Sequence, residues 1–255
     1  MAEPRIDYGR MLDVFDLEVE VVADTVESVS LDRPVPECPG LTSGETARHL
    51  GSIYRMLSLW LAHETKPQVW QRKPAPRQSV SDFLLEGAKS LSAQLRAHRA
   101  EDECETWYPS QSDYRFWARR MMHETIVHRG DVQSAAGVAL SEVDSDIAVD
   151  GVDEVLSLWF EHRLHQLGLT GHRRSSVLLT TTGAHSYSWL TRIDRSAVTV
   201  TTVDLVESDA VVLAEPVQLY RWLWGRVPTR QPHVEVRGDD DAIAQLWALL
   251  RLSTR

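Results

Sequence analysis

The sequence has little of several features that usually mark a class of protein. Its 255 residues include only two cysteines, Cys38 and Cys104, which are too few for a disulfide framework. No stretch approaches the roughly 18 consecutive apolar residues of a membrane-spanning helix, and residues 1–10 contain no apolar core of a secretory signal. These absences argue against a disulfide-rich scaffold and a membrane protein. They predict a cytoplasmic protein with reduced thiols.

Basic residues are also scarce. The net charge is -10 and no basic run occurs, whereas proteins that bind nucleic acid or anionic membranes carry basic patches. We therefore expect neither a nucleic acid nor a membrane partner. Only Lys66, Lys73 and Lys89 are lysines, and every other basic residue is an arginine. This skew indicates the codon bias of a GC-rich genome, with chance as the alternative.

The rest of the composition is ordinary for a globular protein. Hydrophobic residues make up 43% of the chain and charged residues 25%, and the length suits one large domain or two modest ones. In the first half, apolar residues recur at helical spacing, which predicts helices over residues 8–29, 42–63, 79–99 and 113–137. The proline-rich stretch 66–78 is predicted to be a loop. We expect residues 1–147 to form a four-helix bundle.

Capping residues mark where three of these helices begin. Thr42 and Glu45 match the capping box T-x-x-E at the start of the second helix. Ser79 and Asp113 precede the third and fourth helices, and Gly137 follows the fourth. Short polar side chains satisfy the free N–H groups of a first turn, and glycine ends a helix easily.

The second half of the chain has a different residue pattern. Branched residues and alternation predict strands over residues 176–182, 185–193, 197–206 and 209–214, with a short strand at 233–238. Helices are predicted near 151–167 and over 216–226 and 239–252. Residues 148–255 are therefore expected to form a small mixed α+β domain, and the fold class is α+β with two domains.

One face of the fourth predicted helix carries groups that bind metals. Glu124 and His128 are four residues apart and so lie about 40° apart around the helix. Asp131, seven residues after Glu124, returns to within about 20° of it. Trp117 and Met121 continue this face and are candidates to line a pocket. Carboxylate–histidine pairs at this spacing also occur on ordinary exposed helices, so the pair alone does not establish a site.

Two histidines elsewhere have open interpretations. His123 lies five residues before His128, so residues 123–128 do not form the H-E-x-x-H motif of zinc proteases. His123 either orients a ligand or packs between helices. His49 shares an apolar stripe with Ile53, Met56 and Trp60, which predicts that it faces the bundle core. A histidine there must be hydrogen-bonded or bound to a metal. A catalytic zinc ion usually has three protein ligands, and His49 is the candidate for the third.

The sequence resembles the mycothiol-dependent maleylpyruvate isomerase family. The resemblance rests on CPGLT (38–42), ARHLG (47–51) and RRMMHETIVHRGD (119–131), together with LWGR (223–226) and VRGD (236–239) in the second half. It covers nearly the whole chain. It implies a DinB-like metal-binding four-helix bundle followed by a C-terminal α+β domain, and an actinobacterial source, which agrees with the arginine bias.

The resemblance also implies a metal site and a co-substrate. The family's ligands fall on His49, Glu124 and His128 of this sequence. They would hold one divalent ion, with zinc preferred and nickel or iron as alternatives, because these donors suit several metals. Mycothiol would be the co-substrate, activated as a metal-bound thiolate that attacks an electrophilic small molecule.

Catalytic roles come from the same resemblance. A family aspartate falls on Asp131, and a family arginine falls on Arg226, with Arg221 as the alternative. Trp117 and Met121 are expected to contact the bound thiol because of their place on the same helix face, and not because of the resemblance. The expected activity is that of an isomerase or a thiol S-transferase, in a protein that is a monomer or a homodimer.

Two other functions stay open on the residues alone: a non-catalytic metal-containing protein that binds a small molecule, and a metal-dependent hydrolase that uses bound water. The chain also departs from the family at Leu41, at residues 214–216 and in the arginine-rich loop 172–174. These positions lie outside the metal ligands, so they affect the expected substrate more than the expected metal.

Overall fold

The computed structural model describes residues 6–184, 186–204 and 206–254. The chain divides into two compact units. The first spans Asp7–Ser141, and the second contains Ile6 and the residues from Glu142 onward. The predicted domain boundary after residue 147 lies inside α5 (Ser145–Glu154) and stays a prediction.

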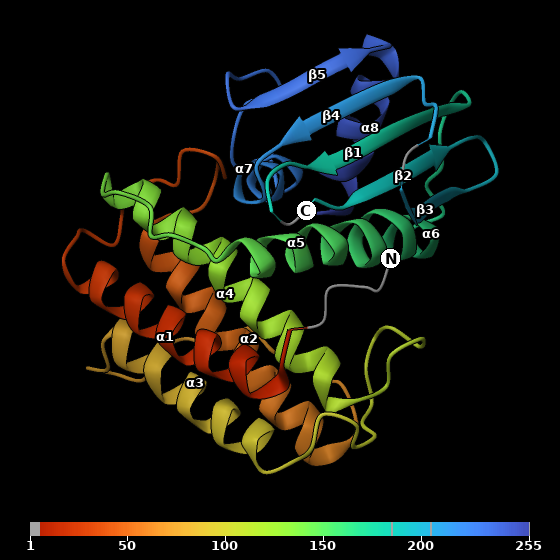
Figure 1. The fold of residues 1–255 in the computed structure, drawn as a ribbon. Coiled ribbons are helices and arrows are strands. Elements are labelled where there is room, and N and C mark those ends of the chain that lie inside the picture. Colours follow the sequence, from red (N-terminus) through yellow and green to blue (C-terminus); the bar gives the residue numbers. More distant parts are fainter. Residues whose placement is uncertain (1–5, 185, 205, 255) are drawn as a thin grey trace. The chain divides into compact units, whose positions relative to one another are not determined.

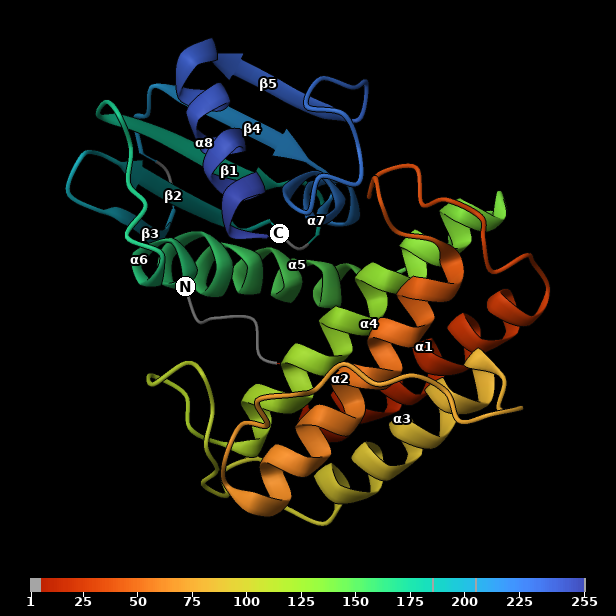
Figure 2. The same ribbon diagram turned by 180° about the vertical axis from the view of Figure 1, so that it is seen from behind.

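The first unit is a bundle of four helices, as predicted. Within it, α1 packs on α4 and α3, and α2 packs on α3 and α4. Figures 1 and 2 show the four helices side by side in this arrangement. Their bounds are α1 (Tyr8–Glu27), α2 (Ser43–His63), α3 (Val80–Arg96) and α4 (Tyr114–Ala136).

Helix caps explain why the predicted bounds lie close to the observed ones. Thr42 and Glu45 form a complete capping box at the start of α2. The side chains of Ser79 and Asp113 accept hydrogen bonds from backbone N–H groups at the starts of α3 and α4. Gly137 ends α4 in the left-handed region with φ of 71°, which a residue without a Cβ adopts at little cost.

Polar contacts inside the bundle fix how its helices lie against one another. Glu18 on α1 and Arg129 on α4 form a buried ion pair. The hydroxyl groups of Tyr54 on α2 and Thr125 on α4 are hydrogen-bonded at 2.7 Å, and both residues are fully buried. Buried polar groups are costly unless they are paired, so these pairs favour one relative position of the helices. The Tyr54–Thr125 bond holds α2 and α4 together beside residue 124.

The second unit begins with one long helical segment. It consists of α5, the π-helix η1 (Val155–Arg163) and α6 (Leu164–Gln166). The prediction of a helix near 151–167 placed its start too late. Asp144, a residue type favoured at N-caps, precedes the true start but makes no side-chain capping hydrogen bond in the structure. Residues 147–149 are nevertheless buried within α5.

A five-stranded mixed sheet follows, in the order β3-β2-β1-β4-β5. Neighbouring strands are antiparallel except β1 and β4, which are parallel. The strands are β1 (Ser175–Thr181), β2 (Ser188–Ile193), β3 (Val198–Val203), β4 (Ala210–Ala214) and β5 (Val234–Gly238). The predicted strands 185–193 and 197–206 include His185 and Leu205, which lie outside the described residues.

Two further helices complete this unit: α7 (Pro216–Leu223) and α8 (Asp240–Ser253). Figure 2 shows α8 lying across one face of the sheet, where it contacts β1 and β4. The expected fold class, a helical bundle followed by an α+β region, is confirmed. Among the described residues, no helix has both the length and the apolar character needed to cross a membrane.

Candidate metal centre

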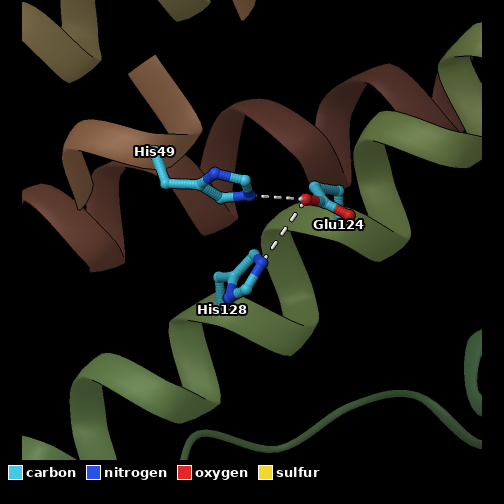
Figure 3. A group of neighbouring side chains, drawn as sticks. All are labelled: His49, Glu124 and His128. Carbon is cyan, nitrogen blue, oxygen red and sulfur yellow. Dashed lines mark hydrogen bonds and ion pairs between the residues drawn. The ribbon is translucent and has the colours of Figure 1, made fainter. Parts of the chain in front are cut away.

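Three side chains from two helices converge in the first unit. His49 projects from α2, and Glu124 and His128 lie one turn apart on α4 (Figure 3). Glu124 Oε1 lies 3.3 Å from His49 Nε2 and 3.4 Å from His128 Nε2. Each residue offers one ligand atom, and the three atoms lie within 4.8 Å of one another. The structure thus brings together the three residues that the sequence singled out as metal ligands.

The second oxygen of Glu124 has a different partner. Arg120, one turn earlier on α4 and only 3% exposed, donates a hydrogen bond from Nη2 to Glu124 Oε2 at 2.6 Å. Burial raises the pKa of Glu124, but the Arg120 guanidinium and the two histidines outweigh burial and hold that pKa well below its usual range. Glu124 is therefore ionised, with Oε1 directed between the histidines.

A second carboxylate orients His128. Asp131 Oδ2 accepts a hydrogen bond from His128 Nδ1 at 2.9 Å, and the Asp131 side chain is fully buried. Burial lowers the pKa of His128, but Asp131 and Glu124 outweigh it and raise the pKa to about 9. Such a carboxylate–imidazole pair fixes the ring so that Nε2 faces the centre, an arrangement common to metal-binding histidines. The Cys38 thiol donates a weak hydrogen bond to the same oxygen at 3.9 Å.

The donor set fits a divalent transition metal. Two imidazole nitrogens and one carboxylate oxygen are ligands that zinc, nickel and iron all accept, and three protein ligands leave coordination positions for other molecules. The side chain of His49 is 31% exposed, against 14% for Glu124 and 12% for His128. The centre is therefore most accessible from solvent beside His49.

The expectation that His49 shares a core-facing stripe with Ile53, Met56 and Trp60 holds only at Trp60, which is buried. His49, Ile53 and Met56 are half-buried, whereas Leu50 and Leu57 are fully buried. The core-facing side of α2 is thus rotated from the predicted stripe, and His49 lies at its margin. The apolar residues near His49 suggested a buried face because helical periodicity does not distinguish the middle of an apolar face from its edge.

The other predicted residues of the first unit are buried. Trp117 donates from Nε1 to the carbonyl oxygen of Glu105 at 2.9 Å, and its ring packs against Trp60 at 5.1 Å between ring centroids. Met121 is buried. The role of Trp117 and Met121 as thiol contacts stays a prediction. His123 is fully buried, as packing between helices requires.

Arg226 belongs to the second unit. Its Nη1 donates to the carbonyl oxygen of Trp224 at 2.8 Å, just after α7. The alternative, Arg221, lies within α7 and is half-buried. The catalytic role assigned by resemblance to Arg226 stays a prediction.

Two residues of the site were missed by the sequence analysis. Arg120 lies four residues before Glu124, and that spacing brings opposite charges together on a helix. The Arg120–Glu124 contact could therefore have been predicted from the sequence. Trp70 lies in the loop between α2 and α3, with its ring centroid 5.9 Å from that of His49. No periodic pattern links a loop residue to a helix, so nothing in the sequence indicated this contact.

Comparisons with known proteins give matches over most of the chain. A family model described as the mycothiol maleylpyruvate isomerase N-terminal domain matches residues 15–133, and one described as the MDMPI C-terminal domain matches residues 146–245. No curated protein sequence matches significantly.

Two solved structures are similar over nearly their full length. The crystal structure of the mycothiol-dependent maleylpyruvate isomerase has a TM-score of 0.57 and 13% identity, covering 94% of this chain and 97% of that one. A histidine-to-alanine mutant of the mycothiol-dependent maleylpyruvate isomerase has a TM-score of 0.60 and 12% identity, with the same coverage. At these identities the similarity supports a shared fold.

Proposed function

This chain belongs to the mycothiol maleylpyruvate isomerase family, and we propose that it is a metal-dependent enzyme that uses mycothiol as co-substrate in an isomerase or S-transferase reaction on an electrophilic small molecule. The two matched regions together cover most of the chain, so the assignment applies to the enzyme as a whole. The observation that carries the metal-dependent part is the convergence of His49, Glu124 and His128.

These three residues would hold a divalent ion, with zinc preferred. When bound, the ion supplies a Lewis acid that lowers the pKa of a coordinating thiol, so that mycothiol reacts as its thiolate. In an isomerase, addition of the thiol to a double bond, rotation and elimination regenerate it. In an S-transferase the adduct is the product.

The chain's own residues prepare the site. Arg120 keeps Glu124 ionised and occupies Oε2, which leaves Oε1 for the ion. Asp131 is buried behind His128, so we propose that it acts by positioning that imidazole. We propose Arg226 as the group that binds a substrate carboxylate, because guanidinium pairs with carboxylates through two hydrogen bonds.

Metal analysis tests the ligand set. Purified protein should contain about one equivalent of a divalent metal, as three ligands for a single ion imply. The His49→Ala variant should lose it, whereas His63→Ala, which changes an exposed histidine at the end of α2, should keep it. Equal metal content in wild type and His49→Ala would contradict the assignment.

A thiol assay tests the co-substrate and the competing functions. Mycothiol should raise the melting temperature of the metal-loaded protein, and glutathione should not. With mycothiol and an electrophile such as maleylpyruvate, multiple turnover is expected. Stoichiometric consumption alone would indicate a binding protein, and turnover without any thiol would indicate a hydrolase.

A further inference from the structure

The metal centre has an aromatic neighbour that the helices do not supply. Trp70 lies in the loop 64–79 between α2 and α3, and its ring meets that of His49 edge-on, at an interplanar angle of 68°. The side chain is half-buried, and its indole N–H has no hydrogen-bond partner among the described residues. A large apolar ring is thus left partly in water beside the most exposed ligand.

The loop is held in place at this point. Ser52, one helical turn after His49 on α2, accepts a hydrogen bond from the backbone N–H of Arg72 at 3.0 Å. Its own hydroxyl proton lies between the carbonyl oxygens of Arg48 and Arg72, at 2.9 Å and 3.0 Å. Ser52 is fully buried. The Arg48 side chain adds a longer bond to the carbonyl oxygen of Arg72 at 3.4 Å. Because residue 72 is fixed to α2, Trp70, two residues away, is positioned against His49.

We propose that Trp70 is a binding residue for the thiol co-substrate and stacks on the apolar face of one of its sugar rings. This inference rests on the proposed function, in which the thiol sulfur reaches the centre. The body of a thiol bound there must leave through the accessible side, where His49 is exposed and Trp70 stands. An indole offers a flat apolar surface, which suits the C–H face of a sugar ring. A small acyclic diacid would gain little from it.

Calorimetric titration of the zinc-loaded protein tests this proposal with two thiols. Mycothiol carries sugar rings and N-acetylcysteine does not. The Trp70→Ala variant should retain about one equivalent of zinc, as wild type does, because Trp70 is not a ligand. Its Kd for mycothiol should rise about tenfold, the size expected for one lost aromatic contact. Its Kd for N-acetylcysteine should stay at the wild-type value.

Two further variants extend the test: one is a control, and the other disturbs the position of the loop. Trp107 is also half-buried in the first unit, but its ring packs against Phe116, so Trp107→Ala should change neither Kd. Ser52→Ala removes the backbone anchor of the loop and should weaken mycothiol binding in the same direction as Trp70→Ala.

The outcomes separate this inference from the proposed function. If wild type binds mycothiol and Trp70→Ala binds it equally well, the stacking role is overturned and the proposed function stands. Equal weakening toward both thiols would also overturn it, because the effect would then act at the sulfur and not at the sugar. If wild type binds neither thiol, both the proposed function and this inference are contradicted.

Discussion

At the scale of single residues, the two oxygens of Glu124 have different partners. Oε1 faces both histidines and Oε2 is hydrogen-bonded to Arg120. A carboxylate held in this way would bind a metal ion through one oxygen in a fixed direction. The arginine therefore contributes to the site without being one of its ligands.

The Arg120→Met variant should bind zinc about 10- to 100-fold more weakly, the usual cost of removing a group that orients a ligand. The physical reason is that Glu124 loses its ionic partner while it stays largely buried. Competition with a chromophoric chelator measures the affinity. Arg115→Met, a change on the same helix at a residue paired with exposed Glu101, serves as the control. Wild-type affinity in Arg120→Met would contradict this role.

The two cysteines are free thiols, and Cys104 should be unreactive at neutral pH. Burial and the neighbouring Asp113 carboxylate raise the pKa of the Cys104 thiol to about 12. Only the thiolate is alkylated, so the rate with iodoacetamide should rise about tenfold per pH unit from pH 8 to 11. Mass spectrometry of a Cys38→Ser protein measures this rate. A plateau near pH 9 would show an ordinary thiol.

At the scale of helices, the pairing of α1 with α4 depends on a buried charge pair. Replacing Glu18 by alanine leaves the guanidinium of Arg129 buried without its carboxylate. The free energy of unfolding should fall by about 3–5 kcal/mol, as is usual when one partner of a buried pair is removed. Urea unfolding followed by circular dichroism measures it.

The matched comparison is the double variant Glu18→Leu with Arg129→Met. It replaces both charges by apolar side chains of similar size, so it should be more stable than Glu18→Ala alone. A double variant that is the less stable of the two would show that the ion pair itself, and not the unpaired charge, determines the loss.

At the scale of the whole molecule, removal of the metal should lower the melting temperature. An ion that binds only the folded state stabilises it by mass action. At a zinc concentration near 100 times Kd, chelation with EDTA should lower the melting temperature by about 5–10 °C for a chain of this size. Differential scanning calorimetry measures the shift, and His49→Ala should show none. Equal responses of the two proteins would place the effect elsewhere.

The sequence predicted the architecture because local signals and the fold agree. Helical periodicity and the caps at Thr42, Ser79 and Asp113 placed the bundle, and alternation of branched residues placed the strands. The start of α5 was placed too late although Asp144, a favoured N-cap residue, precedes it.

The candidate site was only partly open to the same reasoning. Glu124 and His128 are related by helix geometry alone, so their pairing could be inferred. The distance from His49 to Glu124 depends on how α2 packs against α4, which includes the buried Tyr54–Thr125 bond. Neither the packing nor the position of Trp70 follows from local sequence, because both depend on contacts between residues far apart in the chain.

The attachment of the loop 64–79 has a consequence for sequence variation and engineering. Ser52 binds the loop through the backbone N–H and C=O of residue 72, and the Arg72 side chain is exposed. Any amino acid except proline supplies both backbone groups, so the anchor tolerates nearly every residue at position 72. Residues 67–71 can therefore diversify, by evolution or in a randomised library, while the loop stays docked. If Trp70 contacts the thiol as proposed, new thiol preferences are expected there without any change to the candidate metal ligands.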